Sequence, residues 1–132
     1  MITFKEFTEN RPILHVIEPM HIDEIGEVTA KIDSGNEAYN VLHGTDIQMN
    51  DSSVSFVSVN GKRLIKPFED TITIHIGSGV KEDRPLVKFN IKLQDKEYND
   101  IPFSIADRSE NEEPVLVGEP FIKMINALID VN

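Results

Sequence analysis

The chain has 132 residues and a formal charge of −10, from 23 acidic and 13 basic residues. A field of that sign repels phosphate backbones, so the composition disfavours nucleic acid as a partner. Cysteine is absent, which excludes a disulfide framework, a thiolate zinc site and a cysteine nucleophile. The length fits one domain over residues 1–132.

The chain contains no obvious membrane or export signal. No apolar run reaches the roughly 20 residues that a membrane-spanning helix needs. Residues 1–7 also lack the apolar centre of a signal peptide. We therefore expect a soluble, cytoplasmic protein with no membrane partner.

The N-terminal half predicts short strands. Residues 13–17 form an apolar run, which we expect to end at Glu18 and Pro19. Residues 27–33 alternate between apolar and polar side chains, as in a half-buried strand, and turn residues follow them. Residues 53–59 are rich in β-branched side chains and predict a further strand.

The strand pattern continues through the middle of the chain. Asn60-Gly61 comes directly after the last of these strands, and this dipeptide is a strong signal for a hairpin turn. Residues 71–76 predict another strand, and residues 86–93 alternate strictly over a long one. After a turn at residues 95–96, a strand over residues 101–106 runs back.

Only the C-terminal end has a helical period. Pro120 suits the first turn of a helix, and residues 127–131 could leave the helix as a terminal strand. The apolar side chains recur every three or four residues, at Phe121, Met124, Ile125 and Leu128. About eight strands and one short C-terminal helix predict an all-β protein, either a small closed barrel or a sandwich.

The chemically suggestive unit is Asp33-Ser34-Gly35, where a strand delivers an aspartate to a turn. Aspartic proteolysis needs two carboxylates that share one proton, one acting as base toward water and the other as acid toward the scissile carbonyl. A hydroxyl next to the aspartate can donate to a neighbouring chain, and glycine lets backbone approach the carboxylates closely. The tripeptide by itself is also common turn chemistry.

The second half of the chain favours the catalytic interpretation. Residues 114–118 form an apolar strand that ends in a glycine immediately before the predicted helix. Retropepsins, the small dimeric aspartic proteases, have the same order: a catalytic strand and turn, a flap hairpin, an apolar strand ending in glycine, and a helix. Asn60-Gly61 lies where the flap would be. We therefore expect a closed retropepsin-like barrel with one short C-terminal helix.

At these segments the chain resembles a known family, the RimK-associated "ATP-dependent zinc proteases", which have a retropepsin-like fold despite their name. The resemblance covers roughly residues 12–126. The matching segments are residues 30–35 with Leu42-His43 shortly after, residues 84–89, residues 103–109 and residues 114–122.

The resemblance implies roles for particular residues. It carries Asp33 over as the catalytic aspartate, with Ser34 and Gly35 completing the motif. Lys31, Arg84 and Arg108 match basic positions of the family and are candidates for substrate binding. Family members are associated with the removal of glutamate tails, a task for which such cations are suited.

The chain departs from the family pattern after Gly35. The family usually continues with a small residue, an arginine and hydroxyl residues, whereas this chain has Asn36, Glu37 and Ala38. An acidic residue where a cation is expected speaks against a pure glutamate tail as the substrate. We expect instead a peptide or protein substrate with at least one acidic side chain near the scissile bond.

A homodimer follows if the chain cleaves peptides by this mechanism. Asp33 belongs to the one Asp-(Ser/Thr)-Gly unit of the sequence, and a single aspartate cannot form the pair. Two copies related by a two-fold axis would supply it. Two alternatives remain open: a catalytically silent module of the same fold that binds peptides or scaffolds an assembly, and a monomer in which Asp33 pairs with Asp107.

We expect neither a metal nor another cofactor. The four histidines, His15, His21, His43 and His75, show no metal-ligand spacing. His43 matches the family pattern, and a hydrogen-bonded structural role suits it best. A local ion pair is the simplest expectation for both Arg84 and Arg108. No serine lies in the Gly-x-Ser-x-Gly unit of a serine hydrolase.

Overall fold

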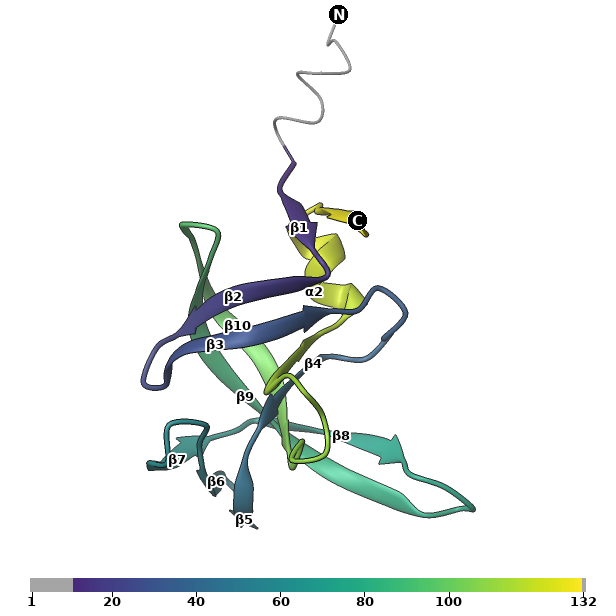
Figure 1. Cartoon of the computed structure of the whole chain (residues 1–132). Helices are drawn as coiled ribbons and strands as arrows, with labels where there is room; N and C mark the ends of the chain where they lie inside the picture. Colours follow the sequence, from purple (N-terminus) through teal and green to yellow (C-terminus); the bar gives the residue numbers. More distant parts are fainter. Residues whose placement is uncertain (1–10, 132) are drawn as a thin grey trace, which may run out of the picture.

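The computed structural model describes residues 11–131 (Figure 1). The expectation about residues 1–7 lies outside this part. The described residues form twelve strands and one short helix. Six of the strands close into a β-barrel, which confirms the predicted all-β barrel. In this part of the chain no helix is both long and apolar enough to cross a membrane.

The barrel closes because β9 and β10 pair with each other as well as with their other neighbours. An additional strand, β8 (Asp70–His75), pairs with the free half of β9. Around the ring the order is β10 (Lys96–Ala106), β4 (Asn40–His43), β11 (Val115–Val117), β3 (Gly26–Ile32), β2 (Ile17–Ile22) and β9 (Lys81–Leu93).

The core fills the barrel with the apolar faces that the alternation predicts. Every second residue is buried in β3, and in β9 from Pro85 onward, while the residues between them are mostly exposed. Phe89 and Phe103 meet edge to face, with ring centroids 5.9 Å apart. The fully buried side chains of the core include Met20, Ile22, Leu42, Phe56, Val87, Ile105, Val115 and Val117.

The N-terminal run is longer and more broken than predicted. β1 (Ile13–His15) ends before Val16, and β2 continues through Glu18 and Pro19 rather than stopping there. Pro19 pairs with Thr29 of β3, but β2 pairs with β9 only from Met20 onward. At Pro19, therefore, no strand is paired on the β9 side of β2, so the N–H that proline lacks is not needed there for a hydrogen bond between strands.

A second sheet consists of β5 (Thr45–Met49), β6 (Ser53–Val57) and β7 (Arg63–Pro67). Asn60-Gly61 forms the turn between β6 and β7, as predicted, and Gly61 has φ 85°. Asn60 Nδ2 donates a hydrogen bond to the Ile25 carbonyl at 3.1 Å. This hydrogen bond ties the turn to the barrel.

The β8–β9 hairpin projects from the body (Figure 1). Its ladder runs from Asp70 opposite Leu86 to His75 opposite Lys81. Gly77 and Gly79 lie at its tip with φ of 125° and 80°, and the tip is exposed.

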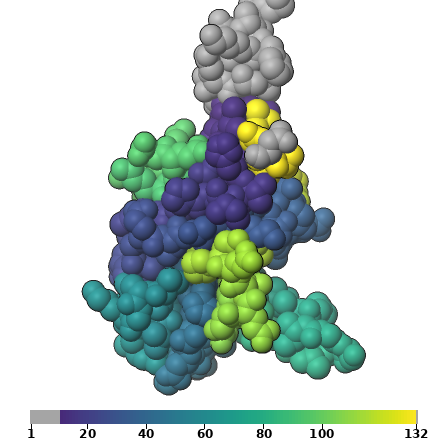
Figure 2. All heavy atoms as spheres, viewed as in Figure 1, coloured from purple at the N-terminus to yellow at the C-terminus, as the bar shows by residue number. Residues whose placement is uncertain are grey.

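The helix is shorter than its apolar period predicts. α2 (Glu119–Met124) ends because Asn126 adopts the left-handed conformation at φ 56°. The chain then forms β12 (Leu128–Asp130), the terminal strand that the sequence left open. β12 pairs in parallel with β1, so that the two ends of the described chain lie together (Figures 1 and 2).

Candidate active site

Asp33 directly follows β3, at the point where three strands meet. Its backbone N–H donates to the Val117 carbonyl at 2.9 Å. β11, which carries Val117, lies between β3 and β4, parallel to the first and antiparallel to the second. The strand before Asp33 (β3) and the strand before the helix (β11) are therefore held together by backbone hydrogen bonds.

The Asp33 side chain closes its own turn. The Gly35 N–H donates to Asp33 Oδ1 at 3.0 Å, and the Asn36 N–H donates to the Asp33 carbonyl at 3.1 Å. A Cβ at Gly35 would lie 3.3 Å from Oδ1, so glycine permits this close approach. Asp33 is half-buried and Ser34 is exposed. Oδ2 has no hydrogen-bond partner among residues 11–131.

Gly118 holds the turn from the other side. Its N–H donates to Asn40 Oδ1 at 2.9 Å, and the next N–H, of Glu119, donates to the Asn36 carbonyl at 2.7 Å. A Cβ at Gly118 would overlap the Ala38 carbonyl oxygen. Gly118 has an extended backbone, with φ −96°, so this close approach is what requires glycine there.

Sequence reasoning missed two asparagines of this loop. Asn40 is 3% exposed, and besides the bond from Gly118 it donates through Nδ2 to the Pro102 carbonyl at 3.4 Å. Asn36 accepts from the Ala38 N–H at 3.1 Å, while its Nδ2 is buried without a partner in the described part of the chain. The only sequence signal for Asn40 is an amide directly before the apolar pair Val41-Leu42.

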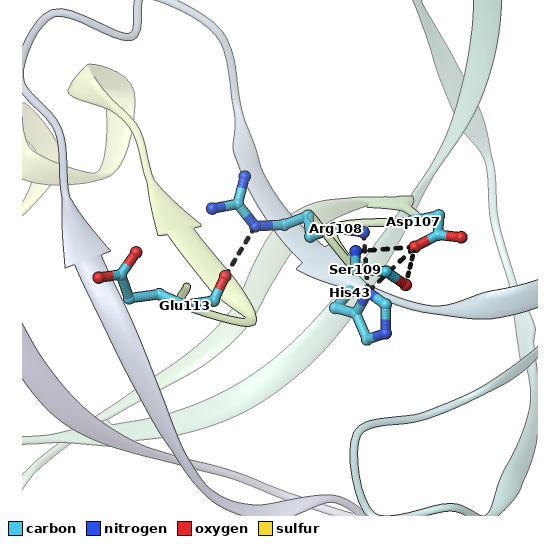
Figure 3. A network of polar contacts seen from close by, with 5 residues as sticks. All are labelled: His43, Asp107, Arg108, Ser109 and Glu113. Atoms are coloured by element: carbon cyan, nitrogen blue, oxygen red, sulfur yellow. Dashed lines mark hydrogen bonds and ion pairs between the residues drawn. The ribbon is translucent and has the colours of Figure 1, made fainter. Parts of the chain in front are cut away.

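A polar network lies at the other end of β4, around His43 (Figure 3). The Arg108 N–H donates to His43 Nδ1 at 2.8 Å, so a neutral His43 carries its proton on Nε2. The expected structural role of His43 is confirmed. Asp107 Oδ1 lies 3.8 Å from the same ring nitrogen.

The Arg108 side chain points away from this network, toward Glu113 (Figure 3). Its Nε donates to the Glu113 carbonyl at 3.0 Å. Burial lowers the pKa of the Arg108 guanidinium, and the Glu113 carboxylate partly opposes this shift. Among residues 11–131, Arg108 makes no ion pair within 4.0 Å, and its guanidinium instead holds the far end of its own loop through the Glu113 carbonyl.

Asp107 binds its own turn and makes no hydrogen bond or ion pair with Asp33 in the part of the chain described. Its Oδ1 accepts from the Ser109 N–H at 2.8 Å and from the Ser109 hydroxyl. These two hydrogen bonds, the hydroxyl first, lower the pKa of the Asp107 carboxyl. The monomeric alternative, in which Asp33 pairs with Asp107, gains no support.

Ser109→Ala should raise the pKa of the Asp107 carboxyl toward its ordinary value. A depressed pKa means that the bonds from Ser109 favour the ionised form, so their contribution is lost as pH falls through the folded pKa. An NMR titration of the side-chain carboxyl carbon measures this. Ser52→Ala, at an exposed serine of the β5–β6 turn, is the control. An unchanged Asp107 titration in Ser109→Ala would contradict this assignment.

The two other basic candidates lie on different strands. Lys31 is exposed on β3, opposite Ile17 on one side and Leu116 on the other. Arg84 is half-buried on β9, and its Nε donates to Glu82 at 2.9 Å, which confirms the expected local ion pair. No hydrogen bond or ion pair among residues 11–131 joins Lys31, Arg84 or Arg108 to one another or to Asp33.

Glu37 is exposed in the β3–β4 connection, close enough to Lys123 for their charges to attract. Lys123 pairs chiefly with Glu119 one helical turn away, and this bond raises the pKa of its ammonium group. The carboxylate that departs from the family pattern thus faces a cation of α2. No group of three or more His, Cys, Asp or Glu side chains in the described residues could hold a metal ion.

Comparisons with known proteins add evidence about the fold. No protein-family model and no curated protein matches the chain. Among solved structures, the chain is similar to Lpg0085 from Legionella pneumophila, a protein of unknown function (DUF785). The identity is 23%, the TM-score is 0.73, and the match covers 91% of this chain and 93% of that one. The two proteins share a fold over nearly their whole lengths.

Proposed function

We propose that this chain is one subunit of a homodimeric aspartic endopeptidase, in which the Asp33 side chains of two copies activate water for peptide-bond hydrolysis. The observation that carries the proposal is the turn at Asp33. A half-buried carboxylate at a strand end is fixed through Oδ1 by the Gly35 N–H at 3.0 Å, and Oδ2 has no hydrogen-bond partner among residues 11–131. This is the geometry that a carboxylate needs if it is to share a proton with a second one.

The second carboxylate comes from a second copy. Two carboxylates about 3 Å apart cannot both ionise, so one keeps a proton and acts as the acid while the other acts as the base. Asp107, the intrachain alternative, is bound by Ser109. A two-fold axis next to Asp33 places two identical turns face to face.

Apolar side chains exposed on β1 and β2 and just after β12 offer a surface for this dimer. Ile13, Ile17 and Val131 are 47%, 45% and 77% exposed. The Val16 carbonyl accepts the Ile32 N–H at 2.7 Å, so Ile17 lies beside the strand end that carries Asp33. Burying such side chains against a second copy is favourable, at about 25 cal/mol per Å² of apolar surface.

Ile17→Glu should therefore weaken the dimer by about tenfold or more, because it places a charge where an apolar side chain would be buried. Sedimentation velocity over a concentration series measures the dissociation constant. Ile65→Glu is the matched control, because Ile65 is 71% exposed but lies on β7 in the second sheet. Equal dimer affinity in Ile17→Glu and wild type would place the interface elsewhere.

The β8–β9 hairpin is the proposed flap. Its tip carries Gly77 and Gly79 and extends beyond the barrel (Figure 1). Two such hairpins, one from each copy, could close over a bound peptide and exclude water from the carboxylate pair.

Substrate preference for acidic side chains remains a prediction from the family resemblance. Arg84 and Arg108 already have partners, Glu82 and the Glu113 carbonyl, whereas the ammonium group of Lys31 has no hydrogen-bond or ion-pair partner among the described residues. Lys31 is thus the first candidate to bind a substrate carboxylate. Charge-assisted bonds of this kind contribute about 1.5–3 kcal/mol.

A cleavage survey over a mixed peptide library tests the proposal. We expect hydrolysis that a chelator leaves unchanged and that peptides carrying a tetrahedral-intermediate mimic inhibit. Lys31→Ala, Arg108→Ala and Glu37→Arg variants would report on acidic preference. Peptide binding without any hydrolysis would overturn the proposal in favour of a catalytically silent peptide-binding module.

A further inference from the structure

Three hollows on the outer face of the barrel join into one groove. The first, of about 300 Å³, is lined by Tyr39, Pro102, Pro120, Phe121 and Met124 among others. A second, of about 170 Å³, shares Tyr39 and Pro102 with it. A third, of about 260 Å³, shares Glu69, Leu86 and Lys88 with the second. The groove crosses from α2 and the β3–β4 connection to the base of the β8–β9 hairpin.

The first end of the groove is apolar. Besides the two prolines, it exposes part of Tyr39 (40%) and of Met124 (60%). Phe121 and Ile101 form its floor and belong to the core. A hollow of this size and composition would take one aliphatic or aromatic side chain.

The other end is acidic. Glu69, Asp70 and Asp100 line it together with Lys66 and Lys88. Lys66 is bound to Glu24 at 2.5 Å and lies over the Phe89 ring, so its charge is already compensated. Three carboxylates therefore face one uncompensated ammonium group, and the charge that complements them is positive.

The strand pairing sets the distance between the two ends. Pro102 pairs with Lys88 across β10 and β9, and Leu86 pairs with Asp70 across β9 and β8. Tyr39 directly precedes β4, the next strand beyond β10. From β4 to β8 there are three strand spacings, about 14 Å, which is the reach of about four residues of extended chain.

We propose that this groove is a docking site for an extended segment of a partner protein with one large apolar side chain and, about four residues away, a lysine or arginine. The apolar side chain enters the hollow at Tyr39 and Met124. The cation binds at the acidic end, beside Glu69 and Asp70. The site lies outside the barrel and is a surface additional to the proposed catalytic turn.

A phage-displayed library of random twelve-residue peptides tests the proposal. The wild type serves as target, and a Met124→Glu variant removes binders that do not use the groove. We expect enriched peptides to share an apolar residue and a cation about four positions apart. Met124→Glu and Asp70→Lys should each weaken the best peptide by about tenfold or more, and raised salt should weaken it further.

Met49→Glu and Glu110→Lys are the matched controls, because both residues are exposed and lie outside the groove. They should bind the peptide like wild type. Failure to enrich any peptide over the Met124→Glu variant, or enrichment of acidic peptides, would overturn the proposal. So would self-association that Met124→Glu abolishes, because the occupant would then be a second copy of this chain.

Discussion

Asp33→Asn should reduce peptide hydrolysis by about 10³-fold or more while leaving the fold intact. The substitution removes the group that takes the proton from water, and general acid–base catalysis is worth 10²- to about 10⁴-fold. An asparagine Oδ1 can still accept the Gly35 N–H that fixes the side chain. The free energy of unfolding should therefore change by no more than about 0.5 kcal/mol. Initial rates on the best library peptide measure the first effect, and urea denaturation measures the second.

The same variant tests whether two copies share one site. If each site needs both Asp33 side chains, mixing wild type with Asp33→Asn subunits should lower activity as the square of the wild-type fraction. A linear decrease would mean that each subunit acts alone. Asp51→Asn, at an exposed aspartate between β5 and β6, should have no effect in either assay.

Gly118→Ala should destabilise the protein by about 3 kcal/mol, near the upper end of the usual cost of overpacking. The added methyl group would overlap the Ala38 carbonyl oxygen, which belongs to backbone and cannot rotate away as a side chain could. Relief of the overlap would separate Gly118 from the loop that holds Asp33. We therefore expect activity to fall as well, beyond what the unfolded fraction explains.

Gly61→Ala is the matched control for this prediction. Nothing lies within 4 Å of a Cβ at Gly61, but φ is 85°, so the substitution costs only the strain of a left-handed residue. That strain is about 1–2 kcal/mol. Chemical denaturation of both variants gives the comparison, because the midpoint shifts at constant slope report stability. A smaller loss in Gly118→Ala than in Gly61→Ala would mean that the loop is not fixed as described.

Local patterns were sufficient to predict most of the strands and the β6–β7 turn, whereas the choice of a closed barrel over a sandwich came from the likeness to retropepsins. The alternation over residues 86–93 gave the correct buried and exposed faces of β9, because side-chain direction in a strand has a period of two. Asn60-Gly61 predicted the β6–β7 turn correctly, because this dipeptide by itself favours a tight hairpin turn. Asp33 became the catalytic candidate because of the three residues of its turn and the apolar strand ending in glycine before α2, and this role stays a prediction.

Features set by long-range contacts could not be predicted. β5 has mostly exposed side chains and no alternation, so only its pairing with β6 makes it a strand. The role of Asn40 depends on Gly118, which lies 78 positions away in the chain. The hydrogen bond that ties Asn60 to the Ile25 carbonyl joins residues 35 positions apart and likewise has no sequence signal.

The most direct test of the central claim is the separation of the two Asp33 carboxylates in a crystal structure of the protein. We predict a symmetric dimer in which the two side chains face each other across a two-fold axis, with their nearest oxygens about 3 Å apart. The two β8–β9 hairpins should lie on the same side of this pair. A monomer, or a dimer in which the two Asp33 side chains are far apart, would contradict the shared site and the mechanism built on it.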